Sequence, residues 1–133
     1  MSEEQTMEID GAAFDDFEGF IAHCNERLFD VGPWNGDLDV LNDLLHGGFG
    51  NRAEGVRVHW RNVAGSREAL GHFAMAVWLR QNLKECHPSS RDDVQKRLAR
   101  AENREGDTLF DLILEIFLVR RGDSGIEVVL EAV

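Results

Sequence analysis

The sequence predicts an α/β domain in which three short parallel strands are flanked by helices. One observation is the length of 133 residues, which suits a single compact domain with a real hydrophobic core. Another is that short strand-like apolar segments occur early, midway and late in the chain, at Met7–Ile9, Gly55–Trp60 and Ile126–Leu130. A third is that segments with helical spacing of apolar residues separate them, as expected when helices connect parallel strands.

Local patterns support the first two strands. Met7–Ile9 is followed by Asp10-Gly11, a turn dipeptide. In Gly55–Trp60 the apolar residues alternate with Arg57 and His59, the period of a strand with one buried face. We expect His59 to be a hydrogen-bonded structural residue, because no partner for catalysis stands at a suitable spacing.

The first helix is predicted over Phe14–Leu28, where apolar residues recur at helical spacing. Within it we expect Cys24 to be a small core residue and His23 to lie at the surface. The second cysteine, Cys86, is far away and no CxxC pattern occurs, so both are expected to be reduced thiols in a cytoplasmic protein. No export signal and no apolar run approaching about 18 residues is present, so no membrane segment is expected.

The stretch Trp34–Gly50, WNGDLDVLNDLLHGGFG, predicts a short amphipathic helix with an acidic outer side. Leu38, Val40, Leu41, Leu44 and Leu45 project on one side, and Asp39, Asn42, Asp43 and His46 on the other. First-turn carboxylates such as Asp37 and Asp39 are stabilised by the helix dipole and the unpaired N–H groups. Asp43 is not, because it stands near the C-terminal end, just before Gly47 and Gly48. Such an acidic side is either simply solvated or a recognition surface.

Phe29–Gly36 contains Gly32, Pro33 and Gly36 and is predicted to be a loop. It places Trp34 immediately before the acidic helix. An aromatic side chain at this place is either a lid on the core or an anchor for a partner, and the sequence favours neither.

The net charge of −11 is concentrated in the first third of the chain. The first 46 residues contain twelve acidic side chains and one basic side chain, Arg27, whereas the remainder contains thirteen of each. Such a surface repels nucleic acid and anionic lipid and speeds the encounter with a basic protein. The alternative interpretation is that the acidity only keeps the protein soluble.

The later helices follow from apolar spacing and from start and stop signals. Ser66–Leu83 is predicted to be one helix that ends before Pro88, with Phe73 and Val77 on its apolar side. Ser90 and Asp93 resemble a capping box for a basic helix to about Ala101, whose interleaved acidic residues favour a solvated or intramolecular role over nucleic-acid binding. Asp107 is a plausible N-cap for a helix over Thr108–Arg121.

Known catalytic signatures are missing from the sequence. It contains no GxGxxG, Walker, GxSxG or HExxH motif and no Cys/His quartet, and its five histidines share no ligand spacing. We therefore expect no catalytic residue, no metal and no cofactor. A hydrolase or metal protein using Asp39, Asp43 and His46 is the weakest of the three functional hypotheses considered.

In its order of elements the chain resembles the barstar family of intracellular ribonuclease inhibitors. The resemblance rests on the strand before Gly11, the helix Phe14–Leu28, the strand with Arg61 after it, the final helix and strand over Thr108–Leu130, and above all the segment Trp34–Leu45. It covers more than half of the chain. It implies a small barstar-like layer of three parallel strands flanked by helices. Val63–Glu105 has no counterpart and would be a two-helix insertion in a single domain of residues 1–133.

The resemblance further implies that the acidic helix and its preceding loop plug the active site of a basic ribonuclease. In the family, the aspartate matching Asp43 stands in for a substrate phosphate, and the one matching Asp39 contacts the same cleft. A carboxylate suits this role because it offers two acceptor oxygens to a guanidinium. The chain departs from the family in having Pro33 and Trp34 where tyrosines are typical, and Asn42 in place of the aromatic residue within the helix.

We therefore expect an acidic, non-enzymatic protein that occludes a basic ribonuclease. The expected contacts are Asp39 and Asp43 as charge partners, with Trp34, Asn42, His46 and Gly47 around them. The second hypothesis is an immunity-like or regulatory module of the same fold with a different basic protein as partner. Neither nucleic acid nor a membrane is expected as a partner.

Overall fold

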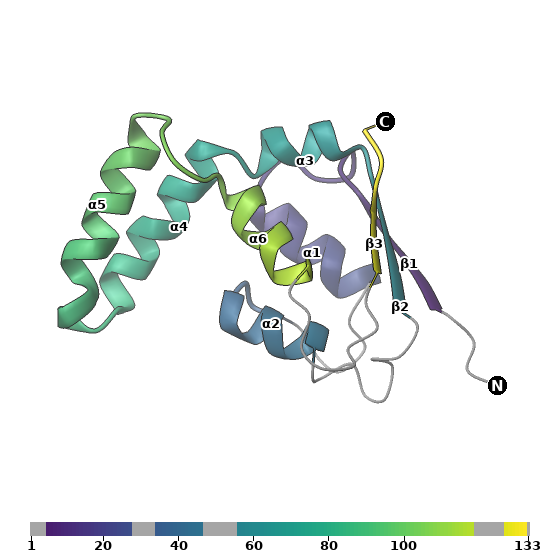
Figure 1. Ribbon diagram of the computed structural model, residues 1–133, viewed down its shortest axis with the longest axis horizontal. Coiled ribbons are helices and arrows are strands. Elements are labelled where there is room, and N and C mark those ends of the chain that lie inside the picture. Colours follow the sequence, from purple (N-terminus) through teal and green to yellow (C-terminus); the bar gives the residue numbers. More distant parts are fainter. Residues whose placement is uncertain (1–4, 28–33, 47–55, 119–126, 133) are drawn as a thin grey trace.

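The computed structural model describes residues 5–27, 34–46, 56–118 and 127–132 (Figure 1). In chain order its elements are β1 (Gln5–Asp10), α1 (Phe17–Arg27), α2 (Leu38–His46), β2 (Val56–Arg61), α3 (Val63–Ala69), α4 (His72–Glu85), the 3₁₀ turn η1 (Pro88–Ser90), α5 (Arg91–Glu102), α6 (Leu109–Leu118) and β3 (Glu127–Leu130). The predicted α/β class is confirmed.

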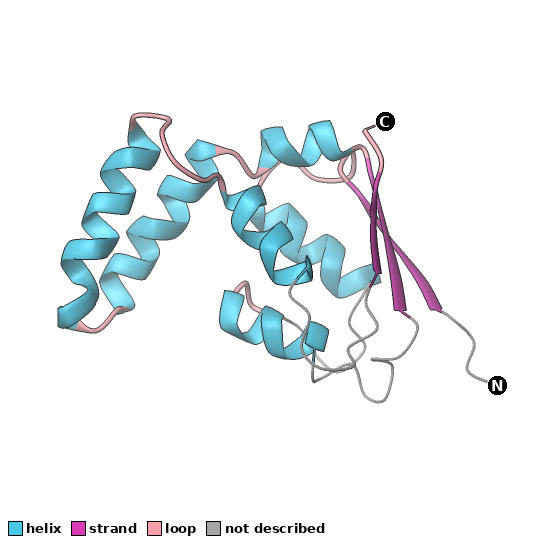
Figure 2. Cartoon of the chain, viewed as in Figure 1, coloured by secondary structure: helices cyan, strands magenta, loops and turns pink. Residues whose placement is uncertain are grey.

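The three strands form one parallel sheet in the order β1-β2-β3. Ile9 of β1 pairs with Trp60 of β2, and Val58 of β2 pairs with Val128 of β3. Helices cover one face of this sheet and leave the other open (Figure 2). The prediction of three parallel strands is therefore confirmed, with helices on a single side.

Side chains alternate between the two faces of the sheet, as a period of two requires. Ile9, Val58 and Trp60 are buried beneath the helices. On the open face, Nε2 of His59 lies 2.7 Å from a carboxylate oxygen of Glu131. His59 thus has a structural partner on the neighbouring strand's end, in agreement with its predicted role.

Trp60 is the centre of the core. Its side chain is fully buried and stacks on Phe20 of α1, with ring centroids 5.8 Å apart. Phe110 and Phe117 of α6 meet it edge-on, each at 5.3 Å. The indole N–H donates to Oγ of Ser66 at 2.8 Å, so the one polar atom of this side chain is satisfied. This cluster holds α1, α3 and α6 against the central strand.

The first and last helices begin differently from the prediction, because side chains that were not predicted as caps bind their first N–H groups. The first helix begins at Phe17 and not at Phe14, since Oδ1 of Asp16 accepts the N–H of Gly19 at 2.8 Å. The last helix is capped by Thr108 and not by Asp107. Oγ1 of Thr108 accepts the N–H of Asp111, and Oδ2 of Asp111 accepts the N–H of Thr108. This reciprocal pair is a capping box.

The capping box predicted for Ser90 and Asp93 is wrong. The Ser90 side chain makes no capping bond, and the chain enters α5 through the 3₁₀ turn Pro88–Ser90. Nδ1 of His87 accepts the N–H of Ser89 at 3.1 Å and supplies the cap of that turn. Proline at its first position fits, since proline has no N–H to satisfy.

The single helix predicted over Ser66–Leu83 is two helices, α3 and α4, separated at Leu70-Gly71. The carbonyl oxygen of Leu70 accepts the N–H of Phe110 at 2.7 Å, and Gly71 adopts an extended conformation as the N-cap of α4. A tertiary hydrogen bond therefore ends α3, a cause that apolar spacing does not reveal.

The predicted insertion over Val63–Glu105 contains two structurally different parts. Helix α3 belongs to the core, because Val63 and Ser66 are buried beside the sheet. Helices α4 and α5 form a hairpin at the end of the molecule away from the sheet (Figure 1). An ion pair of 3.0 Å between Arg80 and Glu102 joins the two helices of the hairpin.

His23, predicted to lie at the surface, is buried with 7% of its surface exposed. Its Nε2 accepts the N–H of Asp10 at 2.9 Å, which requires a neutral ring with the proton on Nδ1. Burial lowers the pKa of His23 below its ordinary value, and the nearby charge of Arg27 lowers it further. Cys24, beside it, is fully buried as predicted.

A pH-dependent loss of stability follows from the lowered pKa of His23. Unfolding restores a pKa near 6.5, so the unfolded chain binds a proton that the folded chain resists. Above pH 6.5, protonation of His23 should not reduce the free energy of unfolding. As the pH drops from 6.5 toward the pKa of His23 in the folded protein, the free energy of unfolding should fall. Urea unfolding of wild type and His23→Gln between pH 7.5 and 5.5 checks this, with a shallower slope expected for the variant. Equal slopes would assign the pH dependence to other groups.

Candidate functional site

Helix α2, which carries the acidic side, has a well-defined start. Oδ1 of Asp37 accepts the N–H groups of Asp39 at 2.8 Å and of Val40 at 3.2 Å. Oδ1 of Asn35 in turn accepts the N–H of Asp37 at 3.0 Å. Asp37 is therefore the N-cap of α2, and its carboxylate is already used within the chain.

The described part of α2 separates apolar and acidic side chains, with one exception. Leu38 and Leu41 are buried, and α2 packs against α6. Asp39 and Asp43 are exposed, and no described residue pairs with either carboxylate. Val40 was predicted on the apolar side but is 39% exposed, because it lies at the margin of the buried stripe. The helix thus presents two free carboxylates to solvent within the described structure.

The remaining predicted contacts have different outcomes. Asn42 is half-buried on α2. His46 is the last residue of α2, but its side chain is not among the described ones, and Gly47 lies outside the described residues. The roles of His46 and Gly47 as partner contacts therefore remain predictions.

Trp34, predicted as a partner contact or a lid, is part of the core, with 2% of its surface exposed. Its ring packs edge-on against Phe17 and Phe20, at 6.0 and 6.1 Å. The side chain of Asn25 on α1 makes two hydrogen bonds with the backbone of Trp34. Its Oδ1 accepts the N–H of Trp34, and its Nδ2 donates to the carbonyl oxygen of Trp34. The indole N–H donates to the carbonyl oxygen of Asp37. Trp34 therefore connects α2 to α1. The prediction of Trp34 as a partner contact is corrected: it is a core residue.

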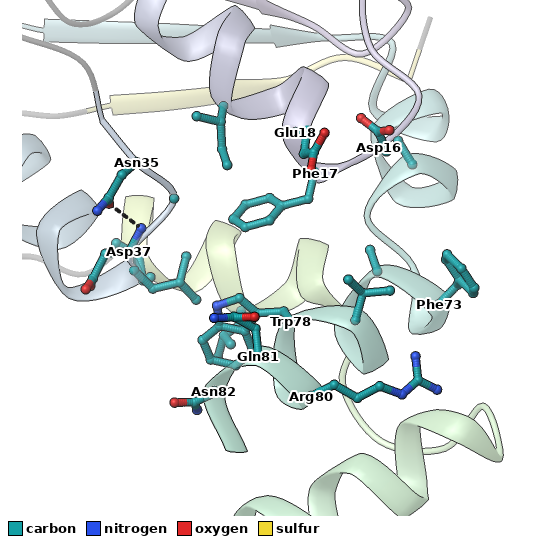
Figure 3. Close-up of a pocket in the computed structure, with 18 of the residues that line it drawn as sticks. Asp16, Phe17, Glu18, Asn35, Asp37, Phe73, Trp78, Arg80, Gln81 and Asn82 are labelled. Carbon is teal, nitrogen blue, oxygen red and sulfur yellow. Dashed lines mark hydrogen bonds between the residues drawn. The ribbon is translucent and has the colours of Figure 1, made fainter. Parts of the chain in front are cut away.

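A groove of about 1380 Å³ runs between α1 and α2 on one side and α4 on the other. Figure 3 shows Phe17 reaching into it from α1 and Trp78 lying on the α4 side. Phe73 and Val77, one turn apart on α4, also line it and are 82% and 49% exposed. Both were predicted to lie on the apolar side of the helix. Helix α4 has apolar residues on more than one side, so a single buried stripe cannot accommodate them all.

The charge around this groove is unevenly distributed. Its lining has eight acidic residues and three basic ones. The acidic residues are Asp15, Asp16, Glu18, Asp37, Asp39, Glu68, Glu85 and Glu115, and the basic ones are Arg80, Lys84 and Arg97. Arg80 is paired with Glu102, and the guanidinium of Arg97 lies 5.9 Å from the ring centroid of Trp78. Asp39 links the groove to the acidic side of α2.

The described residues carry no arrangement of three His, Cys, Asp or Glu side chains that could hold a metal ion. This finding does not include the His46 side chain, so the metal-protein hypothesis is a question for metal analysis of the purified protein. In the same part of the chain no helix has the length and apolar character needed to cross a membrane. Comparison with protein-family models, with curated proteins and with solved structures gives no match.

Proposed function

We propose that this protein is a non-enzymatic inhibitor that binds a basic ribonuclease through the acidic side of α2 and blocks its active site. The observation that carries the proposal is the pair of exposed carboxylates on α2, Asp39 and Asp43, neither of which has a partner among the described residues. Two like charges one helical turn apart repel each other, so their placement favours binding of positive charge over local stability.

The surroundings of α2 support the same role. The acidic excess of the first third attracts a basic protein over a distance of about a Debye length, roughly 8–10 Å at physiological salt. The Asp37 cap and the Trp34–Asn25 bonds fix α2 before any partner arrives. A preorganised surface loses little further conformational freedom on binding. Asn42 at the edge of the acidic side adds an amide that can donate to or accept from the partner.

The mechanism is occlusion. A ribonuclease active site presents cationic side chains to the phosphates of RNA, and a carboxylate pair on a rigid helix offers acceptor oxygens to the same groups. Substrate and inhibitor then compete for one set of positive charges. The proposal assigns this competition to Asp39 and Asp43, with His46 and Gly47 as predicted neighbours.

A titration against basic microbial ribonucleases tests the proposal. Cleavage of a fluorogenic RNA is followed while the full-length protein is added, at low and at physiological salt. We expect stoichiometric inhibition of at least one nuclease, weakened by salt because surface charge contributes to the encounter. Absence of inhibition across the panel would reject the ribonuclease as partner.

A second candidate function is an immunity-like module of the same fold that neutralises a different basic protein. The groove beside α2 favours it, because part of its lining comes from the α4–α5 hairpin, for which the resemblance has no counterpart. Deletion of Val63–Glu105 would not discriminate the two functions, since α3 belongs to the core. Substitution of the exposed Phe73 does so without removing a core element.

A further inference from the structure

We propose that the groove between α1–α2 and α4 binds a basic amphipathic helix of a partner protein. The inference goes beyond the proposed function, because it concerns a surface to which α4 and α6 contribute and does not require the partner to be a nuclease. Among the proposed nuclease contacts, Asp39 and Asn42 also line this groove.

The apolar part of the groove identifies the first property of the occupant. Phe73 is 82% exposed and Val77 is 49% exposed, while Phe17, Leu112 and Ile116 line the same groove and are half-buried. An exposed aromatic residue next to further apolar surface gains free energy when a partner removes it from water. The occupant therefore has an apolar side.

The groove is larger than a typical small-molecule site. Its volume of about 1380 Å³ exceeds the range of roughly 300–1,000 Å³ that is usual for ligand pockets. Its described lining comes from helices and the turns that precede them, and includes no residue of the three described strands. An extended peptide would find no sheet edge to pair with there, whereas a helix satisfies its own backbone hydrogen bonds. A helical segment is the peptide conformation that suits these walls.

Charge identifies the rest of the occupant. Asp15, Glu18 and Asp39 are exposed along the α1–α2 wall, and none of these carboxylates pairs with a described residue. Lysine or arginine residues flanking an apolar stripe would meet these carboxylates. A second copy of this chain would instead bring another net charge of −11 to the same wall. The complementary partner is therefore basic and amphipathic.

The test uses the full-length protein and a labelled Leu/Lys model peptide of about 18 residues, long enough to form a helix when bound, with leucines on one side. Binding is measured by fluorescence anisotropy at physiological salt. A scrambled peptide of identical composition has the same charge without the apolar side. We expect binding of the amphipathic peptide to be at least about tenfold tighter than that of the scrambled one. Equal affinities of the amphipathic and scrambled peptides would show that net charge alone drives binding and would overturn the proposal.

Variants locate the binding on the protein. Phe73→Ser should weaken binding of the amphipathic peptide by about tenfold or more. Leu118→Ser is the matched control, because Leu118 is 54% exposed and does not line the groove. It should change the affinity by less than about twofold. Equal losses in both variants would show that the peptide does not occupy the groove.

A second pair of variants tests the charged wall. Asp15→Asn with Glu18→Gln removes two carboxylates that line the groove, and Glu26→Gln with Glu105→Gln removes two exposed carboxylates outside it. Both doubles change the net charge equally. Only the first should reduce peptide affinity by several-fold, and equal reductions would contradict the inference. Inhibition of a nuclease is not measured in these assays, so their outcome is independent of the ribonuclease proposal.

Discussion

Replacing Asp43 with alanine should weaken binding of the proposed ribonuclease partner by about 2 kcal/mol or more, roughly a 30-fold loss of affinity. The carboxylate is exposed in the free protein. Under the proposed function it is desolvated against cationic groups of the nuclease, which would be left without a partner in the variant. This magnitude is the general one for truncating one partner of a desolvated charge pair. The double variant Asp39→Ala/Asp43→Ala should abolish stoichiometric inhibition.

The matched control is Glu26→Ala, which removes an exposed carboxylate from α1 outside the groove lining. It changes the net charge as Asp43→Ala does, so it reports the effect of bulk charge alone. Inhibition constants and urea unfolding curves should be measured for both variants. Equal affinities of wild type and Asp43→Ala would remove this residue from the interface, whatever the outcome for the peptide groove.

Replacing Gly11 with alanine should destabilise the protein by about 3 kcal/mol, near the upper end of what overpacking costs. A Cβ at this position would overlap the carbonyl oxygen of Asn62 and lie 2.6 Å from Oγ of Ser66. From the other side, a Cβ on Gly65 would lie 2.7 Å from the carbonyl oxygen of Gly11. The end of β1 and the first turn of α3 therefore approach so closely that neither position has room for a methyl group.

Gly71→Ala is the control for this variant. Its added Cβ would be 3.2 Å from the carbonyl oxygen of Arg67, a contact that a shift of a few tenths of an ångström relieves. We expect its effect on stability to stay below about 1 kcal/mol. Urea unfolding at pH 7.5 compares the two variants. A Gly11→Ala protein as stable as wild type would show that β1 and α3 can move apart without loss.

Sequence reasoning predicted the three parallel strands because period-two alternation around Trp60 and separation by helical segments are both local signals. It failed where a distant residue decides the outcome. The break between α3 and α4 depends on the bond from Phe110 to Leu70. The burial of His23 depends on the N–H of Asp10.

At the candidate site, too, local features could be predicted and features that depend on distant residues could not. Exposure of Asp39 and Asp43 follows from the position of α2's apolar side chains, so the helical projection could predict it. The projection could not decide the place of Trp34, because the two hydrogen bonds from Asn25 that draw it inward join different segments. The groove was not predicted, since residues of α1 and α4 come to line one groove only in the folded chain.

The bonds between Asn25 and Trp34 also affect how quickly a complex would separate. Since Trp34, in the segment before α2, is bound to Asn25 of α1, the start of α2 resists local unwinding. A partner bound through α2 would therefore dissociate from an intact helix. Differences in affinity among such partners should be expressed chiefly in their dissociation rates.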